Sequence, residues 1–144
     1  MDIINIPFNK YIRIKTSEKE GCFLEIADES IYLNHIGTVH ASAQFALAEA
    51  TSGQYLQKIL REYDESKVFP VVRSVETKYR KPAKGVVYSS AKVNEDELEK
   101  ARENLKTKGR TMLELLVQLH DENNNMTMVS KFTWYIEVLQ QHTK

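Results

Sequence analysis

Disulfide bonds within this chain are excluded, because Cys22 is the only cysteine among its 144 residues. A single free cysteine is typical of a protein from a reducing compartment. Cys22 precedes Phe23 in a short apolar run, and we expect it to pack as a small buried hydrophobic residue. The chain also lacks internal repeats, low-complexity tracts and linkers. The sequence therefore predicts one domain over residues 1–144.

An excess of charge of either sign is also absent, since 20 Lys and Arg balance 20 Asp and Glu. Without a net positive field, no nucleic-acid partner is expected. No stretch approaches the roughly 18 consecutive apolar residues of a membrane-spanning helix. Residues 1–10 carry an acid at Asp2 and no apolar run of signal-peptide length. We therefore expect a soluble, cytoplasmic protein with no membrane partner.

The pattern of apolar residues predicts an α+β fold. Two short β-rich segments come first, as two strands or one hairpin, and a long alanine-rich helix follows them. Four strands complete the chain, interrupted by a surface helix with Asn94 as its N-cap and Gly109 as its terminator. An antiparallel sheet wrapped around the long helix would bury that helix. In order, the predicted segments are strands 11–15 and 22–27, a loop over 31–37, a helix from about 39 to 63, strands 68–79 and 86–93, a helix over 94–108, and strands 112–120 and 126–138.

The alanine-rich part of the long helix carries an acid, Glu49. On a helix, Glu49 shares a face with Ala46, Ala50 and Gly53, and that face is small and uncharged. Burying a carboxylate there without partners is costly; desolvation would raise its pKa, whereas a nearby donor would lower it. Glu49 is therefore a candidate catalytic acid. The structural alternative is a position at the helix edge, open to solvent.

The start of the long helix has a second chemical feature. Free backbone N–H groups and the positive end of the helix dipole meet there, and they stabilise a carbonyl oxygen that gains negative charge. Ala41 and Ser42 have small side chains, so a substrate could approach this backbone. If Thr38 is the N-cap, however, its hydroxyl would bond the amide of His40 or Ala41 and occupy the donors.

A resemblance to a known family lies in the run from Asn34 to Glu49. It reads Asn34-His35-Ile36-Gly37-Thr38-Val39-His40-Ala41-Ser42-Ala43-Gln44-Phe45-Ala46-Leu47-Ala48-Glu49. This run resembles the signature of hotdog-fold acyl-CoA thioesterases similar to the phenylacetate-pathway enzymes: an Asn, a Gly, a His-Gly-Gly start and a Leu-Ala-Asp/Glu at matching spacing. The stretch over residues 71–85 also resembles that family. The resemblance implies a hotdog fold with the helix 94–108 inserted.

The same resemblance implies a role for each site residue. Glu49 would act as the nucleophile or as a general base on water. The backbone N–H of Ala41 would polarise the thioester carbonyl. Asn34 would hydrogen-bond near the reacting centre, and His40 would help to shape the helix start. In such enzymes the acid and the helix-start amide come from different chains, which implies a homodimer that can pair again into a tetramer.

The implied reaction is hydrolysis of an acyl-CoA, or a related acyl thioester, to a free acid and a thiol. The CoA moiety would enter as part of the substrate, with no separate cofactor, and the histidine spacing predicts no metal site. Gly37 and Ser42 are expected to contact the substrate. Arg80, Lys81 and Lys84 are candidate ligands for the CoA phosphates, although a solvated strand end is the structural alternative.

Other functions remain open at this point. Ala41 and Ser42 replace the two glycines of the family pattern, which favours a non-catalytic acyl-CoA-binding or regulatory hotdog protein. A hotdog dehydratase acting on enoyl thioesters would pair an acid with a histidine on the helix. In this chain no histidine beyond His40 is suitably placed for that pairing. A structural interaction domain, whose basic strand meets an acidic partner, is a further alternative.

Overall fold

Six strands form an antiparallel sheet in the computed structural model, which describes residues 1–139. Residues 140–144 of the expected domain lie outside the described residues. The sheet order is β1-β2-β4-β5-β6-β3. The strands are β1 (Lys15–Thr16), β2 (Leu24–Ile26), β3 (Val68–Tyr79), β4 (Val87–Val93), β5 (Arg110–His120) and β6 (Met126–Val138). The helices are α1 (Pro7–Tyr11), α2 (Ala41–Ile59) and α3 (Glu95–Lys108), and 3₁₀ turns cover Ile3–Asn5, Ser30–Tyr32 and Glu65–Lys67.

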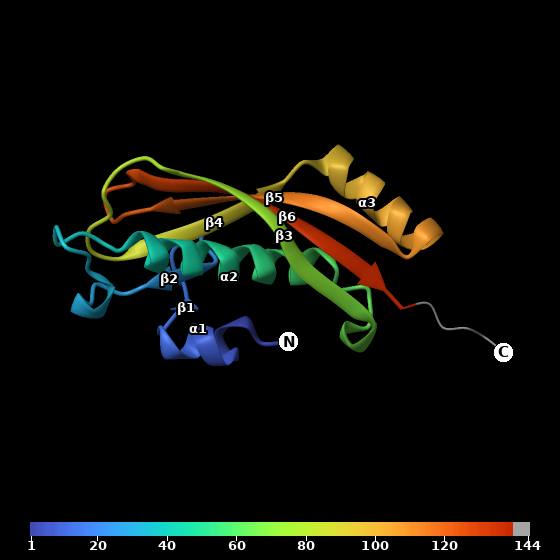
Figure 1. The fold of residues 1–144 in the computed structure, drawn as a ribbon, viewed down its shortest axis with the longest axis horizontal. Coiled ribbons are helices and arrows are strands. Elements are labelled where there is room, and N and C mark those ends of the chain that lie inside the picture. The colour runs from blue at the N-terminus through green and yellow to red at the C-terminus, as the bar shows by residue number, and fades with distance from the viewer. Residues whose placement is uncertain (140–144) are drawn as a thin grey trace.

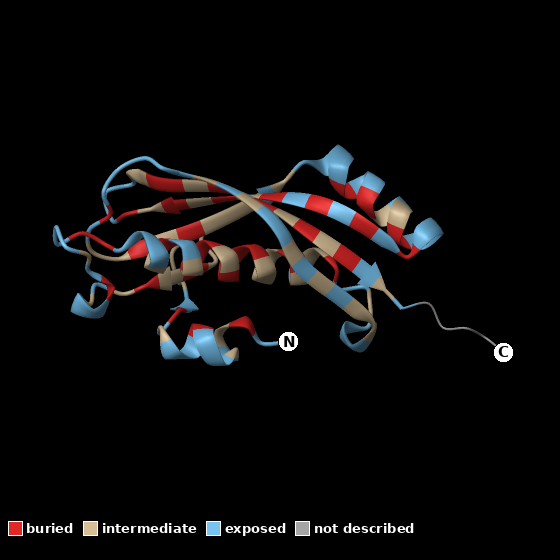
Figure 2. Cartoon of the chain, in the orientation of Figure 1, coloured by how far each residue is buried: buried red, intermediate tan, exposed pale blue. Residues whose placement is uncertain are grey.

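The twisted sheet wraps around α2, as expected from the sequence (Figure 1). In the β5–β6 register, Leu115 pairs with Phe132 and Leu113 with Trp134. All four side chains are buried, and Phe132 stacks against Phe45 of α2 with ring centroids 5.8 Å apart. Figure 2 shows the buried and exposed residues that alternate along β5. This alternation, typical of a sheet with one covered face, directs the apolar side chains toward α2.

A buried hydroxyl pair joins α2 to the sheet. Thr51 of α2 donates to Ser89 of β4 at 2.6 Å, and Ser89 donates to the carbonyl oxygen of Leu24 at 3.0 Å. Thr51, Ser89 and Leu24 are all fully buried. Since buried hydroxyls are costly without partners, these bonds fix the position of α2 over β2 and β4.

The inserted surface helix is present as α3. The Asn94 side chain accepts from the N–H of Glu97 at 3.0 Å, and Gly109 ends the helix with φ of 71°. Leu98, Ala101 and Leu105 form its buried face, packed against β5. Arg102 donates to the carbonyl oxygen of Ile59 at 3.2 Å, which places α3 beside the end of α2. The helix thus covers a part of the sheet that α2 does not reach.

The strand predicted over residues 11–15 is wrong. Pro7 begins a short helix, because its fixed φ suits the first turn, and this helix ends at Tyr11. Arg13 then takes φ of 59°, and the strand β1 is reduced to Lys15–Thr16. The second predicted strand is shorter than 22–27, since only Leu24–Ile26 pairs in the sheet. The N-terminal segment lies on the far side of α2 from β3–β6 (Figure 1).

The bounds predicted for the long helix, 39 to 63, are also too wide. Val39 is extended and pairs with Leu33, and its N–H donates to the carbonyl oxygen of Ala83 at 2.8 Å. His40 is the N-cap, and α2 runs from Ala41 to Ile59. No helix within residues 1–139 has the length and apolar character needed to cross a membrane.

Candidate active site

Glu49 lies in the middle of α2, where its side chain lines a cleft of about 880 Å³. The cleft walls come from the N-terminal segment, α2, β3 and Trp134 of β6. Glu49 is half-buried, and burial raises the pKa of its carboxyl group. Burial is the only influence on this pKa among residues 1–139, where the carboxylate has neither an ion pair nor a hydrogen-bond donor. The structure therefore holds a poorly hydrated carboxylate at the edge of a large cleft.

His40 caps the start of α2. Its Nδ1 accepts from the N–H of Ser42 at 2.9 Å, so this ring nitrogen carries no proton and the Ser42 amide is occupied. The N–H of Ala41 has no acceptor among residues 1–139. The hydroxyl of Thr38 accepts from Asn34 at 2.8 Å and does not cap the helix. Of the two helix-start amides, the one at Ala41 is open to a ligand.

Asn34 and Gly37 shape the loop that leads into α2. The Asn34 Oδ1 atom accepts from the N–H groups of Ile36 and Thr38 at 3.1 and 3.0 Å. Gly37 takes φ of 74°, a left-handed conformation that side chains rarely adopt, and its N–H donates to the Asn34 carbonyl oxygen. After these bonds and the one to Thr38, Asn34 keeps one side-chain N–H for a ligand.

The basic loop after β3 lies beside the helix start. Tyr79 Oη donates to the carbonyl oxygen of Ala41 at 3.1 Å. The bond between the Val39 N–H and the Ala83 carbonyl oxygen holds the other end of this loop against the same region. The side chains of Arg80, Lys81 and Lys84 are exposed there.

Within one chain, Glu49 and the helix start face different clefts. His40 and Ser42 line a second cleft of about 590 Å³, which shares no lining residue with the Glu49 cleft in the described part of the chain. Ala41 and Glu49 are eight residues apart on one helix, a rise of about 12 Å. One chain alone therefore does not bring the acid and the free amide together.

Sequence reasoning did not find two parts of the Glu49 cleft. Trp134 is not among the predicted site residues, but it forms part of the cleft wall. The N-terminal segment contributes Ile3, Ile6 and Asn9. Apolar residues before a short helix give no sign of which cleft they will line, because only long-range packing places them there. No group of three potential metal-ligating side chains occurs within residues 1–139.

A family model, "Domain of unknown function (DUF4442)", matches residues 6–136. No curated protein matches the chain. Among solved structures, a Pseudomonas aeruginosa protein of unknown function, described as a probable thioesterase, is 23% identical with a TM-score of 0.78; 95% of this chain and 91% of that chain are covered. A thioesterase from Haemophilus influenzae is 16% identical with a TM-score of 0.71, covering 99% of this chain and 90% of that chain.

A Bacillus halodurans protein crystallised with CoA is also similar, with 11% identity and a TM-score of 0.63 over 90% of this chain and 74% of that chain. At such identities, the likeness establishes the fold alone. The expected hotdog fold, with a sheet wrapped around a central helix, is confirmed.

Proposed function

We propose that this chain, which belongs to the DUF4442 family of domains of unknown function, hydrolyses an acyl-CoA or a related acyl thioester to a free acid and a thiol. The observation that carries the proposal is the half-buried Glu49 carboxylate at the edge of a cleft of about 880 Å³, where burial raises its pKa and no residue within 1–139 supplies a counter-charge. A carboxyl group whose pKa is raised by burial in a cleft is typical of acid–base sites. The similarity in fold to thioesterases supports the same reaction class.

In the proposed reaction, ionised Glu49 takes a proton from a water molecule as the water oxygen attacks the thioester carbonyl carbon. The carbonyl oxygen gains negative charge, which the Ala41 N–H stabilises. The carbon–sulfur bond then breaks, and the proton held by Glu49 passes to the thiolate. In the nucleophilic variant of this mechanism, Glu49 itself attacks the carbonyl carbon, and the carbon–sulfur bond breaks to give an anhydride and a thiolate. Water then hydrolyses the anhydride, which restores the Glu49 carboxylate and releases the free acid, and the thiolate takes up the proton that this hydrolysis frees.

This reaction needs Glu49 and Ala41 to meet across a homodimer. Among residues 1–139, β3 pairs with β6 alone, so its other edge offers unpaired backbone groups to a second copy. Exposed Phe69 and Val71, at 50% and 57%, lie on this strand. In the proposed dimer, Glu49 of one chain faces the Ala41 amide of the other. Further pairing of dimers would give a tetramer.

The phosphates of CoA are proposed to bind Arg80, Lys81 and Lys84. All three are exposed on the loop that Tyr79 ties to Ala41, so a bound CoA would extend from the helix start toward them. Lys and Arg side chains bind phosphate oxygens through charge-assisted hydrogen bonds. The CoA moiety belongs to the substrate, and the proposed hydrolysis uses no separate cofactor.

The test is thioester hydrolysis over a panel of acyl-CoA substrates by wild type, Glu49→Gln and Glu99→Gln. Glu99 is the matched control, because it is an exposed glutamate on α3, away from the cleft and from the edge of β3. We expect Glu49→Gln to lower kcat by about 10²–10⁴-fold, the usual contribution of a general base, and Glu99→Gln to retain wild-type rates. Equal rates for wild type and Glu49→Gln would show that Glu49 is not the catalytic group.

A second candidate function is acyl-CoA binding without turnover. The observation that favours it is the Ser42 amide, which His40 occupies, so that the helix start offers fewer donors than two free amides would. Calorimetry that detects binding of a CoA ester, together with no hydrolysis by wild type, would select this function.

A further inference from the structure

A gap in the Glu49 cleft opens at Gly53, one helical turn after Glu49 on the same face of α2. A Cβ atom at this position would lie 3.6 Å from Ile3 Cδ1 and 3.7 Å from Trp134 Cη2. Both distances are ordinary van der Waals contacts. Because residue 53 is glycine, a gap of about one methyl group remains beside Ile3 and Trp134, on the face of α2 that carries Glu49.

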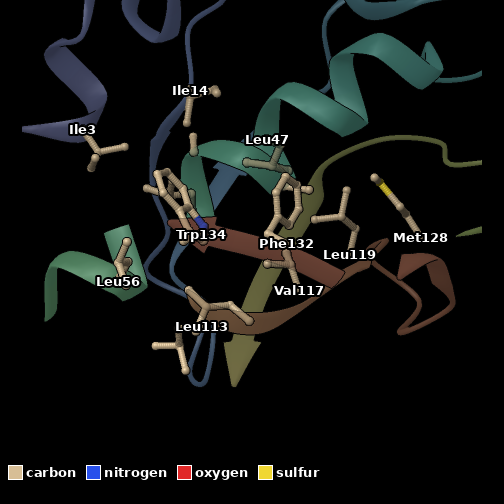
Figure 3. Packing of buried hydrophobic residues seen from close by; sticks show 14 of the residues in the cluster. Ile3, Ile14, Leu47, Leu56, Leu113, Val117, Leu119, Met128, Phe132 and Trp134 are labelled. Carbon is tan, nitrogen blue, oxygen red and sulfur yellow. The ribbon is translucent and has the colours of Figure 1, made fainter. Parts of the chain in front are cut away.

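The two walls of this gap are fixed. Ile3 and Trp134 are only 7% and 6% exposed, and Figure 3 shows both among the buried hydrophobic side chains, with Leu56 nearby. Buried Asn9 donates to the carbonyl oxygen of Ile3 at 2.9 Å, and its own carbonyl oxygen accepts from the N–H of Ile14. These bonds fix the internal shape of the N-terminal segment, and its turn Ile3–Asn5 packs against α2, so Ile3 forms a stable wall.

The chemistry of the gap is apolar. Ile3, Gly53, Leu56 and Trp134 carry no charge, and the indole N–H of Trp134 is engaged by Ser52. The other charged residues of the cleft, Lys58, Arg61 and Glu65, are exposed at its rim. A polar or charged acyl group would therefore lose hydration in the gap without gaining partners, whereas a hydrocarbon chain would leave water at no such cost.

We propose that the acyl group of the substrate is an apolar chain longer than acetyl, which lies over Gly53 between Ile3 and Trp134, where Ile3 limits the volume open to the chain. This inference rests on the proposed hydrolysis at Glu49. It assigns Gly53 and Ile3 as specificity-determining residues, because the space at residue 53 and the position of the N-terminal segment set how much chain the cleft accepts.

The experiment compares Gly53→Ala and Ile3→Ala with wild type on a series of straight-chain acyl-CoA substrates from acetyl to dodecanoyl. Since the added Cβ meets only ordinary contacts, Gly53→Ala folds, and Ala favours a helix interior over Gly. We expect the ratio of kcat/KM for long over short chains to fall about 10-fold or more in Gly53→Ala, as is usual when one methyl group of space is lost. In Ile3→Ala, the preferred chain length should increase.

The control is Thr107→Ala, which raises the helix propensity of α3 at an exposed position outside the cleft. It should keep the wild-type profile, which separates a change in stability from a change in specificity. The same series is measured as binding to Glu49→Gln by calorimetry, so that chain-length preference is read without turnover.

A profile unchanged by both Gly53→Ala and Ile3→Ala, in a wild type that hydrolyses acyl-CoA, would overturn this inference and leave the proposed function intact. Absence of hydrolysis by wild type would instead refute the proposed function, and the binding series would still decide the role of Gly53.

Discussion

The indole N–H of Trp134 donates to the hydroxyl of Ser52 at 3.2 Å, and that hydroxyl donates to the carbonyl oxygen of Glu49 at 2.8 Å. One buried serine thus joins strand β6 to the turn of α2 that carries the candidate acid. Because Ser52 is fully buried and Trp134 nearly so, neither group has water as a substitute partner. The bond fixes the wall of the cleft relative to Glu49.

Removal of this hydroxyl should destabilise the fold. In Ser52→Ala the Trp134 N–H is left buried without an acceptor, and we expect a loss of about 1–3 kcal/mol in the free energy of unfolding. Urea denaturation measures this loss, with the exposed Ser74→Ala as control, for which a change within about 0.5 kcal/mol is expected. The double variant Ser52→Ala/Trp134→Phe should lose less than the sum of the single variants; strict additivity would contradict the coupling.

The pH dependence of stability should change in Glu49→Gln. Because burial raises the pKa of Glu49, the folded chain binds this proton more tightly than the unfolded chain. The free energy of unfolding of wild type therefore falls as pH rises from the ordinary pKa of glutamate through the raised pKa. The stability of Glu49→Gln does not fall over this pH range, because glutamine does not ionise. We therefore expect it to be more stable than wild type at pH values above the raised pKa, and not at pH values below the ordinary pKa of glutamate. Denaturation of both proteins over a pH series checks this, and parallel curves would disprove it.

The roles of Asn34 in the loop and at the substrate can be separated by two substitutions. Asn34→Ala removes the acceptor of two loop amides and should lower thioester hydrolysis. Asn34→Asp keeps that acceptor, and the Thr38 hydroxyl can donate to it, so the loop should be preserved. We expect Asn34→Asp to recover a part of the rate that Asn34→Ala loses. If both variants lose the rate equally while thermal melting shows an intact fold, the free N–H of Asn34 acts on the substrate itself.

Removal of positive charge from the basic loop should raise KM for CoA esters and leave KM for thioesters without phosphate unchanged. Lys81→Gln and Lys84→Gln remove cations proposed to bind phosphate, so KM for acyl-CoA should rise, and the effect should weaken with added salt. The matching N-acetylcysteamine thioester has no phosphate, and its KM should stay constant. Lys106→Gln, at an exposed position on α3, is the control. An equal rise of KM for both thioesters would argue against phosphate binding at this loop.

Local patterns in the sequence were sufficient for much of this fold. The alternation over β5 and the caps at Asn94 and Gly109 predict the last hairpin and α3 well, because each depends on neighbouring residues. The start of α2 was harder to predict from the sequence. Thr38 is a plausible N-cap in the sequence, but its hydroxyl accepts from Asn34 and the side chain of His40 caps the helix instead.

The sequence by itself determined the long helix, the order of the elements that follow it and the placement of Glu49 on the small, uncharged face of that helix, since helical periodicity alone sets which residues share a face. Tertiary structure decided what surrounds that carboxylate. The N-terminal segment lies against Gly53, and Trp134 comes from the last strand, 85 positions along the chain from Glu49. Such contacts depend on how the sheet twists and where α1 packs, and no local pattern encodes them.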